Sequence, residues 1–286
     1  MNPVRTATES PVMVGEIVVP GPAADRLPGV GLAGFVGRSR DVELVPYPAV
    51  TLFLDLGDGL RVAGAGGGSR TGSLVAGLAP GRLRATAQDV ECLQVRLSPP
   101  VARVVLGTAD LGASVAGFDE VWGRGAGELL DRLGTAAGWP DRFALLTAAL
   151  RRRLDRNRPV HPEVAAAWRG MLRRRGQVRV DELAEQVGWS RKRLWSRFRA
   201  QTGVTPKRAA RLVRFDRAAR QLAAGRDVAR VAAECGYADQ SHLHRDAVAF
   251  AGLTPTAVAA APWLSIDGIA WAGEEYAEPR EHSSKP

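Results

Sequence analysis

Histidine and cysteine are scarce in this chain, and their scarcity excludes several kinds of chemistry. The 286 residues include two cysteines, Cys92 and Cys235, and four histidines, of which none lies in residues 1–150. Metal sites usually need imidazole or thiolate ligands, so we expect no metal and no cofactor. Two cysteines so far apart in sequence fit a reduced compartment, and we interpret both as core residues.

Long apolar runs are also missing. No window approaches 18 uninterrupted apolar residues, so the sequence predicts no membrane span. Residues 1–20 lack the apolar core with a basic flank that marks a secretion signal. We therefore expect a cytoplasmic protein without a membrane partner.

Charge is unevenly distributed along the chain. Residues 1–150 hold 13 Lys/Arg and 15 Asp/Glu (net −2), residues 151–260 hold 24 and 10 (net +14), and residues 261–286 hold 2 and 5 (net −3). One strongly basic segment indicates a polyanionic partner for that segment. Arginine-rich surfaces also occur without such a partner, so charge alone does not identify nucleic acid.

The N-terminal half carries the pattern of β-strands. Apolar residues alternate over 50–56 and again over 93–97, the period of a strand with a buried face. The segment 29–34, GVGLAG, has the spacing of a dinucleotide-binding fingerprint, but no strand-like run precedes it. We therefore interpret it as a turn-rich loop. From Pro140 onward apolar residues recur every three or four positions, which predicts a helix at the end of this half.

These patterns predict an α+β fold in which a β-rich domain precedes an all-α domain. The expected boundaries are a β-rich sensing or dimerisation domain over residues 1–150, a charged linker over 151–160, a helical domain over 161–262 and a disordered acidic tail over 263–286.

Two short helices joined by a glycine form the first unit of the helical domain. Asp181 is placed to cap the first helix, Gly188 allows a tight turn, and Ser190 is placed to cap the second helix. Leu194 and Phe198 lie four residues apart, so they can pack together on the first helix. The remaining face of the second helix presents Arg191, Lys192, Arg193, Trp195, Ser196, Arg197 and Arg199.

The same arrangement recurs about fifty residues later. Asp227 and Asp239 are placed to cap two helices that meet at Gly236, and Gly252–Pro255 repeats the G-x-T-P phrase of Gly203–Pro206. The outward positions of the second helix are Gln240, Ser241, His244 and Arg245. Such a repeat is a far stronger signal of a helix-turn-helix pair than one copy.

A helix expected over Pro206 to Ala224 joins the two units. At ~1.5 Å per residue it spans about 30 Å. Successive faces of the major groove are ~34 Å apart, so one chain can place two recognition helices in adjacent groove segments. Each recognition helix packs on its own domain through an apolar stripe, and its opposite face presents cations and polar groups to the bases.

Residues 161–260 resemble the DNA-binding domain of AraC/XylS-type transcription regulators. The motifs that carry the resemblance are LAEQVGWSRKRLWSRFRAQTGVTP, RLVRFDRAARQL and VARVAAECGYADQSHLHRDAVAFAGLTP. The family implies binding through two recognition helices, with base contacts at Lys192, Arg193, Trp195, Ser196, Arg199, Gln240, Ser241, His244 and Arg245. The chain departs from the family at Ser196, where arginine is frequent, and at Ala247, where a large aromatic side chain is usual.

Phosphate contacts are expected from helix N-termini and neighbouring cations. The candidates are Ser190, Arg191, Arg197, Lys207, Arg208 and Arg211. Trp195 stays open between two interpretations, a DNA contact, which we favour, and a core residue beside Leu194. His244 is expected to face DNA and His242 to face the domain interior.

The N-terminal half is similar, more loosely, to a β-rich domain of unassigned function that precedes this DNA-binding unit in many actinobacterial regulators. The matching phrases are LPGV, VTLFLDL and VRLSPPVARVVLG. The resemblance implies effector sensing or dimerisation there, an associational inference.

The expected function is sequence-specific DNA binding that regulates transcription, without enzymatic activity. The expected partner is double-stranded DNA, and further candidates are RNA polymerase, a small-molecule effector and a second copy of the chain. One alternative is a nucleic-acid-modifying or repair enzyme that uses the same DNA-binding unit, and alkyl transfer by such an enzyme needs an activated cysteine. A second alternative is a non-specific architectural DNA-binding protein, which a measured specificity ratio near one would favour.

Overall fold

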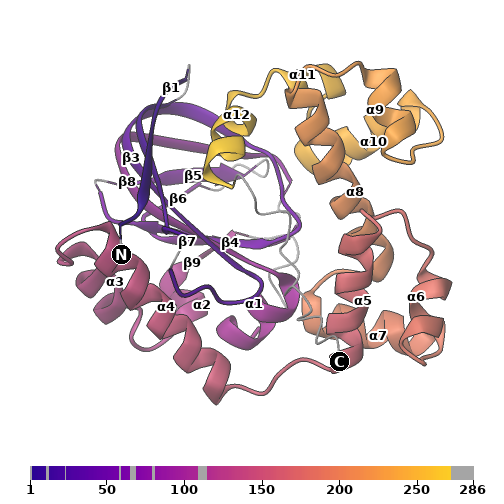
Figure 1. The fold of residues 1–286 in the computed structure, drawn as a ribbon, viewed down its shortest axis with the longest axis horizontal. Coiled ribbons are helices and arrows are strands. Elements are labelled where there is room, and N and C mark those ends of the chain that lie inside the picture. The colour runs from indigo at the N-terminus through magenta and orange to yellow at the C-terminus, as the bar shows by residue number, and fades with distance from the viewer. Residues whose placement is uncertain are drawn as a thin grey trace, which may run out of the picture.

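A β-rich half and a helical half make up the protein (Figure 1), as a computed structural model shows. The structure describes residues 2–10, 13–22, 24–57, 59–64, 69–78, 81–108 and 115–271. The predicted α+β fold is confirmed.

The described strands form one antiparallel sheet in the order β1-β2-β3-β8-β4-β7-β9, from which β5 and β6 branch. The strands are β1 (Val4–Ser10), β2 (Met13–Val19), β3 (Val30–Leu44), β4 (Val50–Asp55), β5 (Arg61–Gly64), β6 (Ser69–Thr71), β7 (Leu74–Ala76), β8 (Leu83–Leu97) and β9 (Val115–Gly117).

The long strand β8 is the centre of this sheet. It pairs with β3 along its whole length, with shifts in register between Arg38 and Val42. Its other edge is shared, because β5 pairs with residues 83–86 and β4 pairs with residues 92–97. Both faces of the sheet are buried. Leu52 and Leu54 of β4 belong to a core that includes helices, whereas Phe53 between them packs in a second core on the opposite face.

Residues 29–34 correct an expectation, because Gly31 to Gly34 lie in strand β3 rather than in a turn-rich loop. The glycine at position 34 has a packing reason. A Cβ added to Gly34 would lie 2.3 Å from the ring of Trp139, so the indole occupies the space of the missing side chain. Gly34 therefore serves the close approach of a helix to the sheet.

The described residues of the N-terminal half also form four helices: α1 (Pro99–Leu106), α2 (Phe118–Trp122), α3 (Ala126–Gly134) and α4 (Trp139–Arg156). The last of them overturns part of the predicted linker, since residues 151–156 continue α4. Leu154 stays half-buried against the core, and Arg153 donates hydrogen bonds to the carbonyl oxygens of Val105 (3.0 Å) and Trp122 (2.5 Å). These contacts extend the helix beyond its apolar part.

The helical half contains α5 (Pro162–Arg173), α6 (Val180–Gln186), α7 (Arg191–Thr202), α8 (Pro206–Ala223), α9 (Val228–Glu234), α10 (Gln240–Ala251) and α11 (Pro255–Ala259). The predicted joining helix is confirmed by α8. Among the described helices, none is long and apolar enough to cross a membrane.

The predicted disordered tail is wrong for its first residues, because α12 spans Pro262–Ala270. Trp263, Ile266 and Trp271 are buried in the second core, against the face of the sheet that carries Phe53. Burial of large apolar side chains compensates for the entropy of ordering this segment. The rest of the predicted tail, residues 272–286, lies outside the described residues.

We predict that Gly34→Ala lowers the free energy of unfolding by about 2 kcal/mol, because the new methyl group overpacks the contact with Trp139. Urea denaturation measures the change. Gly64→Ala is the matched control, since its Cβ has no neighbour nearer than 3.9 Å and the change should stay within about 1 kcal/mol. Equal stability of the two variants would contradict the packing role of Gly34.

Candidate nucleic-acid interface

Helices α6 and α7 form the first helix-turn-helix unit. The turn between them passes through Gly188, whose φ of +66° is in the left-handed region that favours glycine. The hydroxyl of Ser190 accepts a hydrogen bond from the backbone N–H of Arg193 at 3.2 Å, so the predicted cap of α7 is confirmed. The predicted cap at Asp181 is wrong. Helix α6 begins at Val180, so Asp181 lies within its first turn. The carboxylate of Asp181 is 3.3 Å from the guanidinium of Arg191.

Helices α9 and α10 form the second unit, with the same local geometry. Gly236 has a φ of +72° in the turn. Asp227 and Asp239 cap the two helices by accepting hydrogen bonds from the backbone N–H groups of Arg230 (3.0 Å) and His242 (2.6 Å), as predicted. The sequence repeat therefore corresponds to a structural repeat.

Helix α7 keeps its apolar side inside and its polar side exposed. Leu194 and Phe198 are fully buried. The side chain of Trp195 is 45% exposed, with the guanidinium of Arg199 over its ring at 5.4 Å. The other candidates on this helix are also exposed: Arg191, Lys192, Arg193, Ser196 and Arg197. The contacts of this face with DNA remain predictions.

Helix α10 has a similar division. Leu243, Ala247 and Phe250 are buried, and Ala247 has no exposed surface despite its small side chain. The rings of Phe250 and Phe215 stack at 5.6 Å. His242 is half-buried against Tyr237, as expected for an inward-facing residue. The predicted base contacts Gln240, Ser241, His244 and Arg245 are exposed.

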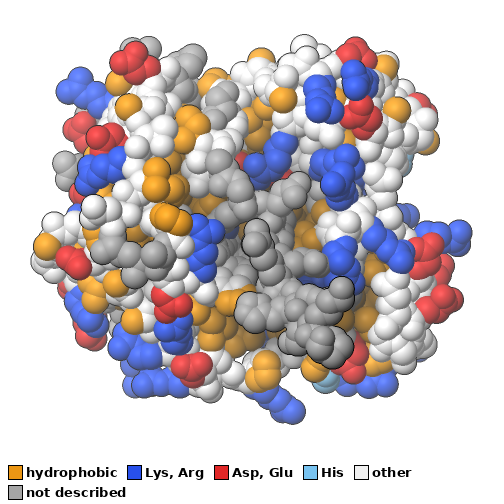
Figure 2. All heavy atoms as spheres, viewed as in Figure 1, with side chains coloured by type: hydrophobic (Ala, Val, Ile, Leu, Met, Phe, Trp, Pro, Cys, Tyr) orange, Lys and Arg blue, Asp and Glu red, His pale blue; other side chains and the backbone are white. Residues whose placement is uncertain are grey.

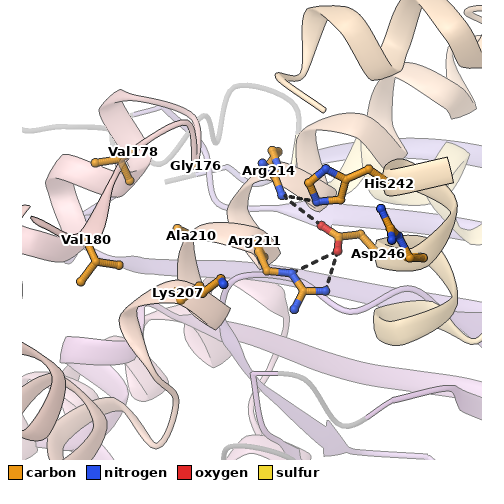
Figure 3. A pocket seen from close by; sticks show the side chains of 10 residues that line it. Gly176, Val178, Val180, Lys207, Ala210, Arg211, Arg214, His242 and Asp246 are labelled. Carbon is orange, nitrogen blue, oxygen red and sulfur yellow. Dashed lines mark hydrogen bonds and ion pairs between the residues drawn. The ribbon is translucent and has the colours of Figure 1, made fainter. Parts of the chain in front are cut away.

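A cation-lined cleft of about 450 Å³ lies between the two units (Figure 3). We call it the interunit cleft. Its walls come from the start of α6 and the segment before it, from α8 and from α10. Its lining residues are Gly176, Val178, Val180, Lys207, Ala210, Arg211, Arg214, His242, Arg245 and Asp246. Figure 2 shows that Lys and Arg side chains also gather over the middle of the helical half.

The buried carboxylate of Asp246 organises the cleft. It accepts hydrogen bonds from Arg211, at 3.1 and 2.6 Å, and from Arg214, at 3.4 Å. Arg214 also lies 3.4 Å from Nε2 of His242 (Figure 3). A fully buried carboxylate requires such partners, so these two arginines of α8 hold α10 in place.

This geometry adds a structural role to Arg211, one of the predicted phosphate contacts, and its contact with a phosphate remains a prediction. Its guanidinium is committed to Asp246. Lys207 and Arg208, in contrast, are exposed near the start of α8. Within the described part of the chain, neither Lys207 nor Arg245 has an acidic partner, so both offer uncompensated positive charge at the cleft.

Sequence reasoning missed Asp246 and Arg214. Asp246 shares the buried stripe of α10 with Leu243 and Phe250, and a carboxylate in an apolar stripe is a signal that could have been read. It calls for a buried cation on the facing helix. The described residues include no group of three or more His, Cys, Asp or Glu placed to hold a metal ion.

Comparison with known proteins identifies this region. Residues 183–261 match a family model described as a helix-turn-helix domain. A search of curated proteins found no match. ToxT from Vibrio cholerae O395 has a similar structure at 8% identity and a TM-score of 0.47, covering 82% of this chain and 98% of that one. A regulator with an AraC-type DNA-binding domain from Chromobacterium violaceum is 23% identical, with a TM-score of 0.33, covering 35% of this chain and 90% of that one. The family match shows that residues 183–261 are a helix-turn-helix domain.

We predict that Asp246→Ala lowers the free energy of unfolding by about 3 kcal/mol, because it leaves Arg214 buried without its carboxylate. Chemical denaturation measures the loss. Glu182→Ala removes the exposed ion pair with Arg174 and should cost less than about 1 kcal/mol. If Asp246→Ala were no more harmful than this control, Asp246 would not hold the second unit.

Proposed function

We propose that this chain is a sequence-specific DNA-binding transcription regulator of AraC/XylS type. One observation carries the proposal: two capped recognition helices, α7 and α10, are each anchored by buried apolar side chains and each expose polar side chains, which are rich in cations on α7 and include Arg245 on α10. Insertion into the major groove requires this division of faces. The match of residues 183–261 to helix-turn-helix domains supports it.

In this proposal the exposed faces of α7 and α10 contact the DNA bases, and the interunit cleft binds the phosphate backbone of the DNA. The cleft lies between the two units, where the strand that connects two major-groove segments passes. Lys207 and Arg245 offer it free positive charge, and phosphates accept hydrogen bonds from cations of this kind. Arg245 therefore lies both in the cleft, where it can contact phosphate, and at the edge of the α10 face that contacts bases.

The N-terminal sheet serves as a sensing or dimerisation domain in this proposal. It lies outside the match to the helix-turn-helix family, and both of its faces carry buried apolar side chains. An effector, a second copy of the chain and RNA polymerase are its candidate partners, and the DNA partner places the protein in the cytoplasm.

The alternative of a repair enzyme with the same DNA-binding unit is disfavoured by the cysteines. Alkyl transfer needs an accessible thiolate. Cys92 and Cys235 are both buried, and burial raises the pKa of each thiol, so the nucleophilic form is suppressed.

We predict that Arg245→Ala costs about 1–3 kcal/mol of binding to the preferred duplex and relaxes the preference at one base pair. The preferred duplex is first selected from random sequences with the full chain, and affinities are then measured for it and for single-base variants. An equal loss on preferred and random duplexes would refute base reading by Arg245.

Lys207→Ala should weaken binding to all duplexes alike and reduce the salt dependence of the binding constant by about one phosphate contact. Titrations over a range of salt concentrations measure the slope. Arg5→Ala, which removes an exposed cation on β1, is the control and should change neither quantity. An unchanged slope in Lys207→Ala would exclude a phosphate from this side of the cleft.

A further inference from the structure

Helix α12 contacts the sheet and the helical half at once. It follows α11 after two residues and lies against β1, β2, β3 and α8 (Figure 1). Ile266 is fully buried on the sheet side, and the rings of Trp263 and Phe35 lie 5.5 Å apart. The chain that leaves the second helix-turn-helix unit is thus anchored on the β-rich half.

A buried charge cluster fixes this anchor, formed by Arg96, Asp216, Arg220 and Asp267. The carboxylate of Asp267 is fully buried and accepts hydrogen bonds from Arg96 of β8. It also lies 3.4 Å from Nη2 of Arg220 on α8. Arg220 in turn donates to Asp216 at 3.2 Å. Two cations and two carboxylates therefore tie together the sheet, α8 and α12.

Arg96 is held in one orientation by aromatic rings. Its guanidinium carbon lies 3.5 Å from the ring centre of Tyr47 and 4.1 Å from that of Trp271. Burial, together with the nearby Asp267, raises the pKa of Tyr47 well above its usual range, so this ring stays neutral. A planar cation between two rings accepts its carboxylate from a limited set of directions, which restricts α12 to one position.

The β-rich half also touches the rest of the helical half. Helix α1 packs on α7 of the first unit and on α5, the helix that precedes this unit. Near the second unit, the side chain of Arg82 packs on Gly252, where an added Cβ would lie 3.2 Å from the Cβ of Arg82. The β-rich half therefore contacts both units. It reaches the first unit through α1 and the second unit through Arg82 and α12.

We propose that α12 is an interdomain strap that sets the spacing at which the two helix-turn-helix units meet DNA, with Asp267 as its positioning residue. The inference rests on the proposed function. Asp267 ties α8 to β8 at one point, so its loss loosens the attachment of the second unit to the sheet, leaving the apolar contacts of α12 and the contact of Arg82, while α1 still holds the first unit. The two units then tolerate more than one separation of their half-sites.

The test uses the full chain and two duplexes: the preferred duplex, and the same duplex with one base pair inserted between the half-sites. One base pair adds about 3.4 Å and about 34° of rotation. The wild-type protein should bind the inserted duplex much more weakly. Asp267→Asn should bind the preferred duplex less tightly and shrink the penalty for insertion about tenfold.

Two further variants make the outcome decisive. Arg220→Gln cuts the tie to α8 but keeps the pair of Arg96 with Asp267, so it should fold and shrink the insertion penalty even if Asp267→Asn does not fold. Asp25→Asn, which breaks an exposed ion pair with Arg151, is the matched control and should leave the penalty unchanged.

Hydrogen exchange over residues 262–271 reports release of the strap. If exchange rises in the variants while the insertion penalty stays at the wild-type value, the positioning role is overturned and the proposed function stands. If the wild-type protein prefers no duplex, the proposed function fails and the strap proposal fails with it.

Discussion

The carboxylate of Asp246 is the point on which the placement of the second recognition helix depends. It is fully buried between α8 and α10, and its charge is compensated by Arg211 and Arg214. A charge in this position is stable only while the two helices stay in register. The helix that joins the two units therefore also fixes one of them, and the interunit cleft is a consequence of this arrangement.

A second buried aspartate, Asp267 of α12, is paired with arginines in the same way as Asp246. At the interunit cleft and at α12, an aspartate with no exposed surface meets arginines from other elements. Apolar packing supplies the bulk of the contact at both places, through Phe250 on Phe215 and Trp263 on Phe35. The paired charges add direction, because hydrogen bonds to a carboxylate are satisfied in few orientations.

Local signals in the sequence predicted the helix-turn-helix units well. Caps at Ser190, Asp227 and Asp239 and the turn glycines act within a few residues, so their chemistry is readable from the sequence alone. The exposed candidates on α7 and α10 follow from helical periodicity for the same reason. Contact of these side chains with DNA is a property of the complex, and it remains a prediction.

Long-range contacts defeated local reasoning elsewhere. Gly34 looks like a turn residue until Trp139 is known to lie on it, and the apolar side chains of α12 have no evident partner beside the acidic tail until the sheet face that they cover is known. Arg211 looks like a free cation until Asp246, 35 residues away, is seen beside it. In each case the deciding partner is far away in sequence, so no spacing rule reveals it.

Interference footprinting on the selected operator tests the central claim most directly, because it reports where each unit enters the duplex. Guanine N7 atoms are methylated, and the positions that block binding of the full chain are mapped. The account predicts two clusters of blocking positions about one helical turn apart on the same face of the DNA. A single cluster, or two clusters on opposite faces, would contradict the reading of adjacent major-groove segments by α7 and α10.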